Sequence, residues 1–223
     1  MEFVFQERPS DAPFVARVWQ TQSQRAGSFI SLAASQWEMV VSKYHGKTTF
    51  TVRGPATKAT SAEFAADTEF FGIVFELGTF IPHLPTVNRL DRNDVILPGA
   101  TGNAIWLNSS AWQIPDYNNA DTFVSRLVRE GLLVRDPIVD AVLQDQAQAL
   151  SIRTLQYRFL RATGLTHKVI HQIERARRAR SLLVQGTPIL DTVYETGYFD
   201  QAHLSNSLKR FIGQTPAQIT RVR

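Results

Sequence analysis

SIRTLQYRFLRATGLTH (Ser151–His167) and DQAHLSNSLKRFIGQTP (Asp200–Pro216) are two copies of one degenerate repeat in a chain of 223 residues. The copies share a leucine, an arginine, a glycine and a threonine at matching places: Leu155 and Leu204, Arg161 and Arg210, Gly164 and Gly213, Thr166 and Thr215. Because the same order of apolar and polar residues occurs twice, we expect both stretches to adopt the same structure.

Each copy of the repeat predicts one short helix. Ser151 and Asp200 stand at the N-cap position, where a side-chain oxygen can accept from the free N–H groups of the first turn. Gly164 and Gly213 predict the helix ends, because glycine enters the left-handed conformation readily. Apolar residues at helical spacing predict an inward face: Ile152, Leu155, Phe159 and Ala162, then Ala202, Leu204, Leu208 and Phe211.

The segments around the repeat complete two helix-turn-helix units, about 137–163 and 188–212. Asp136-Pro137 is a helix start, with a capping Asp and then Pro at the first helical position, and this helix should run to about Ala147. Thr166–Val184 predicts a long connecting helix that Gly186 closes, and residues 188–196 predict a short helix that ends at Gly197.

Residues 1–116 predict a β-rich domain. Short runs rich in Val, Ile, Phe, Thr and Trp alternate with turn residues, which is typical of an antiparallel barrel or sandwich. The runs are FVFQE, FVARVWQTQ, SFISLA, WEMVVSKY, KTTFTVRG, EFFGIVFELG and AIWLNS. The predicted fold is therefore α+β: this domain, a linker helix within 117–135 (Asp121–Leu133), and an all-α domain of two helix-turn-helix units, 136–223.

Charge is divided unevenly along the chain. From Ser151 onward there are 12 Lys and Arg against 4 Asp and Glu, whereas the first 150 residues hold the other 12 basic and 16 acidic residues. A basic segment joined to an acidic one is typical of a protein that binds a polyanion, although a solvated basic face would look the same. The N-terminus has no signal-peptide pattern and no apolar stretch is long enough to span a membrane, so a cytoplasmic location is expected.

The second helix of each unit should carry the residues that contact DNA, since a helix-turn-helix presents that helix to the major groove. Arginine pairs with guanine, and glutamine or asparagine with adenine. The outward residues are Arg153, Gln156, Tyr157 and Arg161 in the first unit, and Gln201, Ser205, Asn206 and Lys209 in the second. The alternative is that these are solvated helix faces. Basic residues that meet phosphates would make binding salt-sensitive; the candidates are Arg153, Arg158, Arg161, Lys168, Lys209 and Arg210.

Aromatic residues of the N-terminal domain are candidates for an apolar effector cavity: Trp19, Trp37, Phe75, Phe80 and Trp106. The alternative for each of them is ordinary core packing. His45, Glu76 and His83 supply two histidines and a carboxylate that could hold a metal ion, but their spacing fits no known motif.

At the repeat, the sequence resembles the AraC/XylS family of bacterial transcription regulators. The resemblance covers Pro137–Arg221 and rests on the motif at Ser151–Thr166, on RARRARSLL in the connecting helix, and on GYFDQAHLSNSLKRFIGQTPAQI at Gly197–Ile219. It implies a DNA-binding domain fused to a sensing domain, with RNA polymerase as a partner. The family's base contacts correspond here to Arg153, Gln156, Tyr157, Gln201, Ala202, Ser205 and Asn206.

The sequence departs from the family pattern at a few positions. Tyr157 and Asn206 stand where many members have Arg. The helix before Ser151 lacks the usual small residue and glycine, and has Asp145, Gln146, Gln148 and Ala149 there instead. The first unit is therefore expected to hold DNA more weakly than the second.

The predicted function is that of a sequence-specific regulator that binds double-stranded DNA, has no enzymatic activity and needs no cofactor or metal. Its other expected partners are a small-molecule effector and a second copy of the chain. Two alternatives stay open: a barrel enzyme tethered to DNA, and a protein-binding scaffold without DNA readout. Related DNA-repair regulators accept alkyl groups on a cysteine, and this chain has no cysteine, so that chemistry is excluded.

Overall fold

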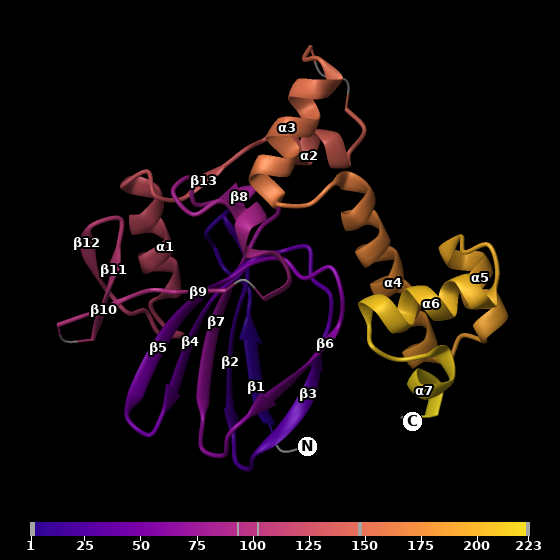
Figure 1. Ribbon diagram of the computed structural model, residues 1–223, viewed down its shortest axis with the longest axis horizontal. Coiled ribbons are helices and arrows are strands. Elements are labelled where there is room, and N and C mark those ends of the chain that lie inside the picture. Colours follow the sequence, from indigo (N-terminus) through magenta and orange to yellow (C-terminus); the bar gives the residue numbers. More distant parts are fainter. Residues whose placement is uncertain (1–2, 93, 102, 147–148, 222–223) are drawn as a thin grey trace. The chain divides into compact units, whose positions relative to one another are not determined.

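The computed structural model describes residues 3–92, 94–101, 103–146 and 149–221, and it divides into two compact units (Figure 1). The first, here called the sheet unit, comprises Met1–Gly27, Gln36–Pro55 and Glu63–Leu165. The second, here called the helical unit, comprises Ser28–Ser35, Ala56–Ala62 and Thr166–Arg223. The segment 136–223 is therefore shared between the two units.

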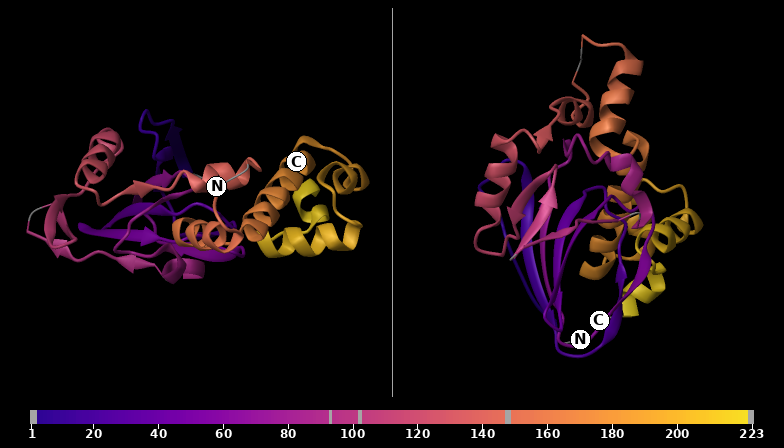
Figure 2. Two further views of the ribbon diagram at one scale, coloured as in Figure 1. Left: turned by 90° about the horizontal axis from the view of Figure 1, so that it is seen from above. Right: turned by 60° about the vertical axis from the view of Figure 1, so that its left-hand side comes forward.

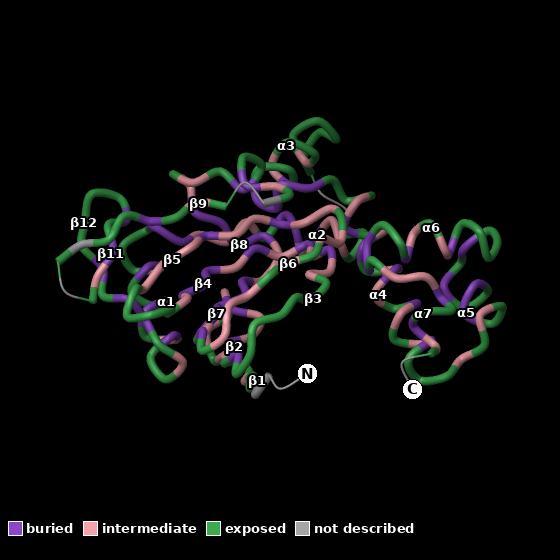
Figure 3. Tube along the Cα trace, turned by 60° about the horizontal axis from the view of Figure 1, so that its bottom comes forward, coloured by how far each residue is buried: buried purple, intermediate pink, exposed green. Residues whose placement is uncertain are grey.

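The sheet unit is built on a six-stranded sheet of order β1-β2-β7-β4-β5-β9, and its described pairs are antiparallel. In β5 the buried Phe50 and Val52 alternate with less buried residues, whereas β4 and β7 carry runs of consecutive buried residues (buried residues are purple in Figure 3). The strands are β1 (Phe3–Arg8), β2 (Val15–Ser23), β4 (Glu38–Tyr44), β5 (Lys47–Arg53), β7 (Glu69–Phe75) and β9 (Val95–Ile96).

A second, three-stranded sheet and one helix pack on the buried face. The sheet has the order β10 (Gly99–Ala100), β11 (Ala104–Leu107) and β12 (Ser110–Gln113), and the helix is α1 (Ala120–Arg129). Side chains from both sheets and from α1 form one apolar cluster that includes Ile73, Trp112 and Leu127. Two sheets thus share one core, which is the sandwich-type arrangement.

The sheet unit also contains the first predicted helix-turn-helix pair, α2 (Ile138–Leu143) and α3 (Ile152–Thr163). Helix α3 packs on α2, on the 3-10 helix η1 (Thr86–Arg92), and on β8 (Thr79–Phe80), which pairs with β13 (Val134–Arg135). Helix α2 ends earlier than predicted, and the predicted end at Ala147 lies outside the described residues.

The helical unit is organised around α4 (His167–Gln185), which α5 (Ile189–Thr196), α6 (Gln201–Phe211) and α7 (Pro216–Arg221) contact (Figure 1 and Figure 2). Its buried stripe consists of Ile170, Ile173, Ala176, Ala179 and Leu183. Burial of each large aliphatic side chain contributes about 1.5–3 kcal/mol, so tertiary packing holds this helix in place. The connecting helix is therefore the core of the second unit; α7 was not predicted.

The predicted N-caps Ser151 and Asp200 and the predicted end at Gly164 are confirmed, whereas α6 ends at Phe211 with Ile212 as its C-cap, before the predicted Gly213. Ser151 Oγ accepts from Thr154 N, and Asp200 Oδ1 accepts from His203 N. Gly164 adopts the left-handed conformation, with φ of 75°. The predicted inward faces are wrong at their first positions: Ile152 is 74% exposed and Ala202 is exposed. Both lie in the first helical turn, beyond the reach of the core that the later apolar residues enter.

Candidate nucleic-acid interface

Helix α3 presents the first set of predicted DNA-contacting residues to solvent. Phe159, Ala162 and Thr163 are its buried positions. Because these occupy one side of the helix, the opposite side is left to Arg153, Gln156, Tyr157 and Arg161, all of which are exposed. The exposed fraction of Tyr157 is 65%. Three hydrogen-bonding side chains and a phenol thus share the open face of one helix, which is the chemistry needed to reach base edges in the major groove.

An ion pair fixes α3 against the start of α2. Arg158 donates from Nε to Asp136 Oδ2 at 2.9 Å and from its terminal nitrogen to Oδ1 at 2.5 Å. The same carboxylate accepts from Ile138 N at 3.1 Å, so the Asp136 side chain meets the first turn of α2 as the sequence predicted, although Pro137 holds the N-cap position itself. The hydrogen bonds and charge of Asp136 raise the pKa of Arg158. Arg158 therefore orients the helix pair and is not a free phosphate ligand.

Arg161 lies near the end of α3, and its guanidinium lies 5.5 Å from the centre of the Phe80 ring. Phe80, which the sequence placed in an effector cavity, is 7% exposed and belongs to β8, one of the elements under α3. A cation over an aromatic face is attracted by the ring quadrupole. Phe80 therefore supports the position of α3.

Helix α6 presents the second predicted set. Leu204, Leu208 and Phe211 are buried, and Asp200 caps the helix start. Gln201, Ala202, Asn206 and Lys209 are exposed, and Ser205 is half-buried. The exposed face holds two amides and one cation, so it can donate to and accept from base edges and can also pair with phosphate.

Tyr198 joins α6 to α4. Its hydroxyl lies 2.7 Å from Ser207 Oγ, and its ring lies 4.2 Å from the Arg175 guanidinium carbon. Arg175 also donates to the Gly197 carbonyl. Arg175, one of the arginines of RARRARSLL, therefore holds the turn between α5 and α6.

Two segments from the N-terminal half of the chain complete the helical unit. They are residues 28–35 and 56–62, here called the ribbon; they include most of β3 (Gly27–Ser31) and part of β6 (Thr60–Phe64), which pair with each other. Ala33 N donates to the Phe211 carbonyl at 2.8 Å, and Ala59 N donates to the Arg210 carbonyl at 2.7 Å. The last carbonyls of a helix have no partner within it, so the ribbon caps the C-terminus of α6.

Side chains of α4 hold the other side of the ribbon. Arg177 donates twice to the Ala33 carbonyl, at 3.1 and 2.8 Å, and Ser35 Oγ donates to Glu174 Oε1 at 2.9 Å. A Cβ on Gly213 would lie 2.8 Å from Ile30 Cγ2, so the ribbon packs closely on the glycine that follows α6. The ribbon was not foreseen as part of this unit, because its contacts join residues far apart in the sequence.

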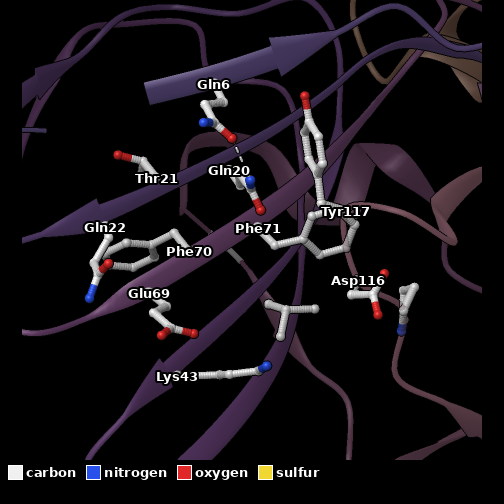
Figure 4. A pocket seen from close by; sticks show the side chains of 12 residues that line it. Gln6, Gln20, Thr21, Gln22, Lys43, Glu69, Phe70, Phe71, Asp116 and Tyr117 are labelled. Atoms are coloured by element: carbon white, nitrogen blue, oxygen red, sulfur yellow. Dashed lines mark hydrogen bonds between the residues drawn. The ribbon is translucent and has the colours of Figure 1, made fainter. Parts of the chain in front are cut away.

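The sheet unit contains a pocket of about 390 Å³ at one end of its buried sheet face (Figure 4). Gln20 and Val41 both pair with Phe71 and therefore share its face of the sheet. Gln20 donates to Gln6 Oε1 at 2.7 Å, the dashed line in Figure 4. The lining residues are Gln6, Gln20, Thr21, Gln22, Val41, Lys43, Glu69, Phe70, Phe71, Pro115, Asp116 and Tyr117.

None of the five aromatic residues predicted to bind an effector lines this pocket. Trp19 pairs with Gly72 on the other face of the sheet, where its ring covers that glycine and Nε1 donates to Glu38. Trp106 is 47% exposed in the small sheet. The polar glutamines at inward positions of β2, after the buried Val18, are the sequence signal that would have indicated the pocket.

Trp37 and Phe75 are the only two of the five that the structure stacks on each other, with ring centres 4.0 Å apart. Trp37 Nε1 donates to the Thr79 carbonyl at 2.6 Å. Both residues belong to the core cluster, with exposures of 3% and 0%. Their environment is that of packed core residues.

Arg89 lies over the ring of Trp37, at 5.3 Å from its centre, although it is only 1% exposed. One terminal nitrogen donates to Thr86 Oγ1 at 3.3 Å, whereas Nε and the other terminal nitrogen have no partner. Burial lowers the pKa of Arg89 to about 10.

Within the described ranges, no three His, Asp or Glu side chains are grouped to hold a metal ion, so His45, Glu76 and His83 form no such set. A further search of the same residues finds no helix that is both long and apolar enough to cross a membrane.

Comparison with known proteins identifies the C-terminal segment. Residues 146–221 match a family described as a helix-turn-helix domain. Over 87 residues the chain is 33% identical to "Regulatory protein ada" of Salmonella typhimurium, which covers 39% of this chain and 25% of that protein. The chain thus spans about a quarter of the length of this curated relative.

Among solved structures, two of ToxT from Vibrio cholerae align with the chain. The first covers 97% of both chains at 10% identity, and the second covers 97% of this chain and 98% of the other at 12% identity. The TM-score is 0.40 in each case, which is too low for the likeness to define the fold.

The α2–α3 and α5–α6 pairs and the matched residues define a DNA-binding helix-turn-helix protein. More particularly, this segment contains the repeat and the motif at Gly197–Ile219, on which the resemblance to the AraC/XylS family of transcription regulators rests. The α+β arrangement of a β-rich part followed by helices is the one predicted from the sequence.

Proposed function

We propose that the chain is a sequence-specific transcription regulator that contacts DNA through α3 and α6. The observation that carries this proposal is that both helices bury one apolar side and leave the predicted base-contacting residues open to solvent. Arg153 would pair with guanine and Gln156 with adenine, whereas Gln201 and Asn206 would contact adenine under the second helix. The bound site would be asymmetric, because the two helices carry different residues.

The length of α4 supports contact with two successive major grooves. Its 19 residues extend about 28 Å at 1.5 Å per residue, which is close to the pitch of about 34 Å that separates such grooves. One chain would then cover two adjacent turns of a duplex, and a homodimer would cover more. DNA contact implies that the protein works in the cytoplasm of a bacterial cell, and the family resemblance supports RNA polymerase as a further partner.

We further propose that the sheet unit binds a small polar effector in the pocket beside Gln20 and Phe71. Amide side chains, Lys43 and Glu69 would bind hydrogen-bonding groups, and the aromatic rings would cover an apolar part. The ribbon supports a route for regulation, since it continues directly into the strands β2, β4, β5 and β7 and caps α6. An effector that shifts those strands would change how α6 is held.

The experiment that tests DNA readout is selection of bound sequences from a random duplex pool with the full chain at near-physiological salt. An enriched asymmetric motif with two blocks about one helical turn apart is the expected result. Binding without any enrichment, sensitive only to salt, would reject sequence-specific recognition. The exposed Leu190 and Tyr194 on α5 would then favour a protein-binding scaffold.

A further inference from the structure

An aromatic side chain is exposed to solvent at the start of α6, the second helix that we propose contacts DNA. Phe199 directly precedes the N-cap Asp200, and 91% of it is exposed. An apolar residue at this position commonly packs on the fourth helical residue, which here is Leu204. Leu204 is completely buried and Phe199 is not, so that contact does not account for the ring. Its neighbour Tyr198, 5% exposed, occupies the inward place instead.

The repeat places an apolar residue at the same point in the first copy. Leu150 precedes the N-cap Ser151 as Phe199 precedes Asp200, and 40% of Leu150 is exposed. Ala202, the second residue of α6, is also exposed and apolar. Exposed apolar groups therefore lie at the beginning of the helix whose N-terminal residues enter the groove in this class of domain.

We propose that Phe199, together with Ala202, contacts the 5-methyl group of thymine in the major groove and so determines specificity for thymine under α6. Thymine differs from cytosine in that groove partly by this methyl group, and apolar side chains recognise it. The inference rests on the proposed function. Gln201, Asn206 and Lys209 are exposed on the same helix and add two amides and a cation, which suits base edges and phosphates better than an apolar protein surface.

Helices α3 and α6 would then recognise bases by different chemistry. Helix α3 exposes Arg153 and Gln156, which read hydrogen-bonding groups. Helix α6 has Ala202 where the repeat has Arg153 in α3, so hydrogen bonding is replaced by an apolar contact. We therefore expect the sequence block under α6 to be rich in thymine.

The test replaces single thymines by deoxyuridine in the sequence selected by the full chain. This exchange removes the methyl group and leaves every base-pairing group unchanged. At one or two thymines under α6, the exchange should lower the affinity of the protein for the duplex about fourfold each, the value expected for one buried methyl group. The variant F199A should bind thymine and uracil sites equally, and F199L should keep part of the difference. The control Y194A, an equally exposed aromatic residue on α5, should keep all of it.

The outcomes separate the two proposals. A pool that yields no enriched sequence rejects the proposed function, and the methyl contact with it. An enriched site that binds equally well with uracil at every thymine rejects the methyl contact alone. So does F199A if it weakens thymine and uracil sites by the same factor, because Phe199 would then act on DNA or folding without recognising the methyl group.

Discussion

The backbone N–H of Ala33 donates a 2.8 Å hydrogen bond to the carbonyl of Phe211, the last residue of α6. This bond joins a segment near the beginning of the chain to the end of a helix that we propose reads DNA. Ala59 makes the same kind of bond to Arg210. Sequence from the predicted regulatory domain is thus part of the unit that positions α6.

The ribbon should exchange its amide hydrogens slowly. We expect Ala33 N–H and Ala59 N–H to be protected in the full chain, and R177Q to lower the protection of Ala33 about thirtyfold. The variant removes two charge-assisted hydrogen bonds to the Ala33 carbonyl, each contributing roughly 1 kcal/mol when half-buried. Hydrogen exchange measures the effect directly.

R178Q is the matched control for that measurement, because Arg178 is an exposed arginine on the same helix. It removes the same charge without touching the ribbon contacts described here. Equal loss of protection in both variants would mean that the charge of α4, and not the Arg177–Ala33 contact, holds the ribbon.

Gly213 should be needed for close packing of the ribbon. G213A adds a Cβ at φ of 76° and 2.8 Å from Ile30 Cγ2. G197A adds one at φ of 69° with no neighbour within 4 Å, so it reports backbone strain alone, about 1–2 kcal/mol. We expect G213A to be the more destabilising variant in urea unfolding, and I30A to reduce that excess. Equal effects of both glycine variants would contradict the packing argument.

The salt dependence of DNA affinity should distinguish basic residues that can contact phosphate from those that are paired within the protein. K209A should reduce the log–log slope of affinity against salt by about 0.9, since Lys209 is exposed on the reader face and can neutralise one phosphate. R158A should leave the slope unchanged, because Arg158 pairs with Asp136. Titration of binding at several salt concentrations measures both slopes. A change of slope in R158A would show that Arg158 contacts phosphate in the complex.

Arg89 should destabilise the sheet unit at neutral pH. Burial lowers its pKa to about 10, so the folded state releases the proton before the unfolded state does, and stability rises with pH only above about 10. At pH 7 the charge is buried with two nitrogens unpaired. We expect R89M to raise the free energy of unfolding by about 1–3 kcal/mol in urea titrations. A loss of stability would show that the Trp37 and Thr86 contacts outweigh the desolvation.

Local features were predictable from the sequence, and long-range ones were not. Ser151 and Asp200 cap their helices as expected, because capping depends on neighbouring residues only. Arg177 contacts Ala33, 144 residues away, and no local pattern indicates that pairing. The pocket was missed because strand pairing, not composition, sets Gln20 beside Phe71 and turns Trp19 to the other face.

The central claim, that α3 and α6 each read part of one DNA site, is tested most directly by selecting sequences with three proteins in parallel. These are the unaltered chain, R153A/Q156A and Q201A/N206A. The account predicts that each variant loses base preference in one block of the motif and keeps it in the other. Identical motifs from all three proteins would contradict it, because the exposed residues of α3 and α6 would then not be the ones that read the sequence.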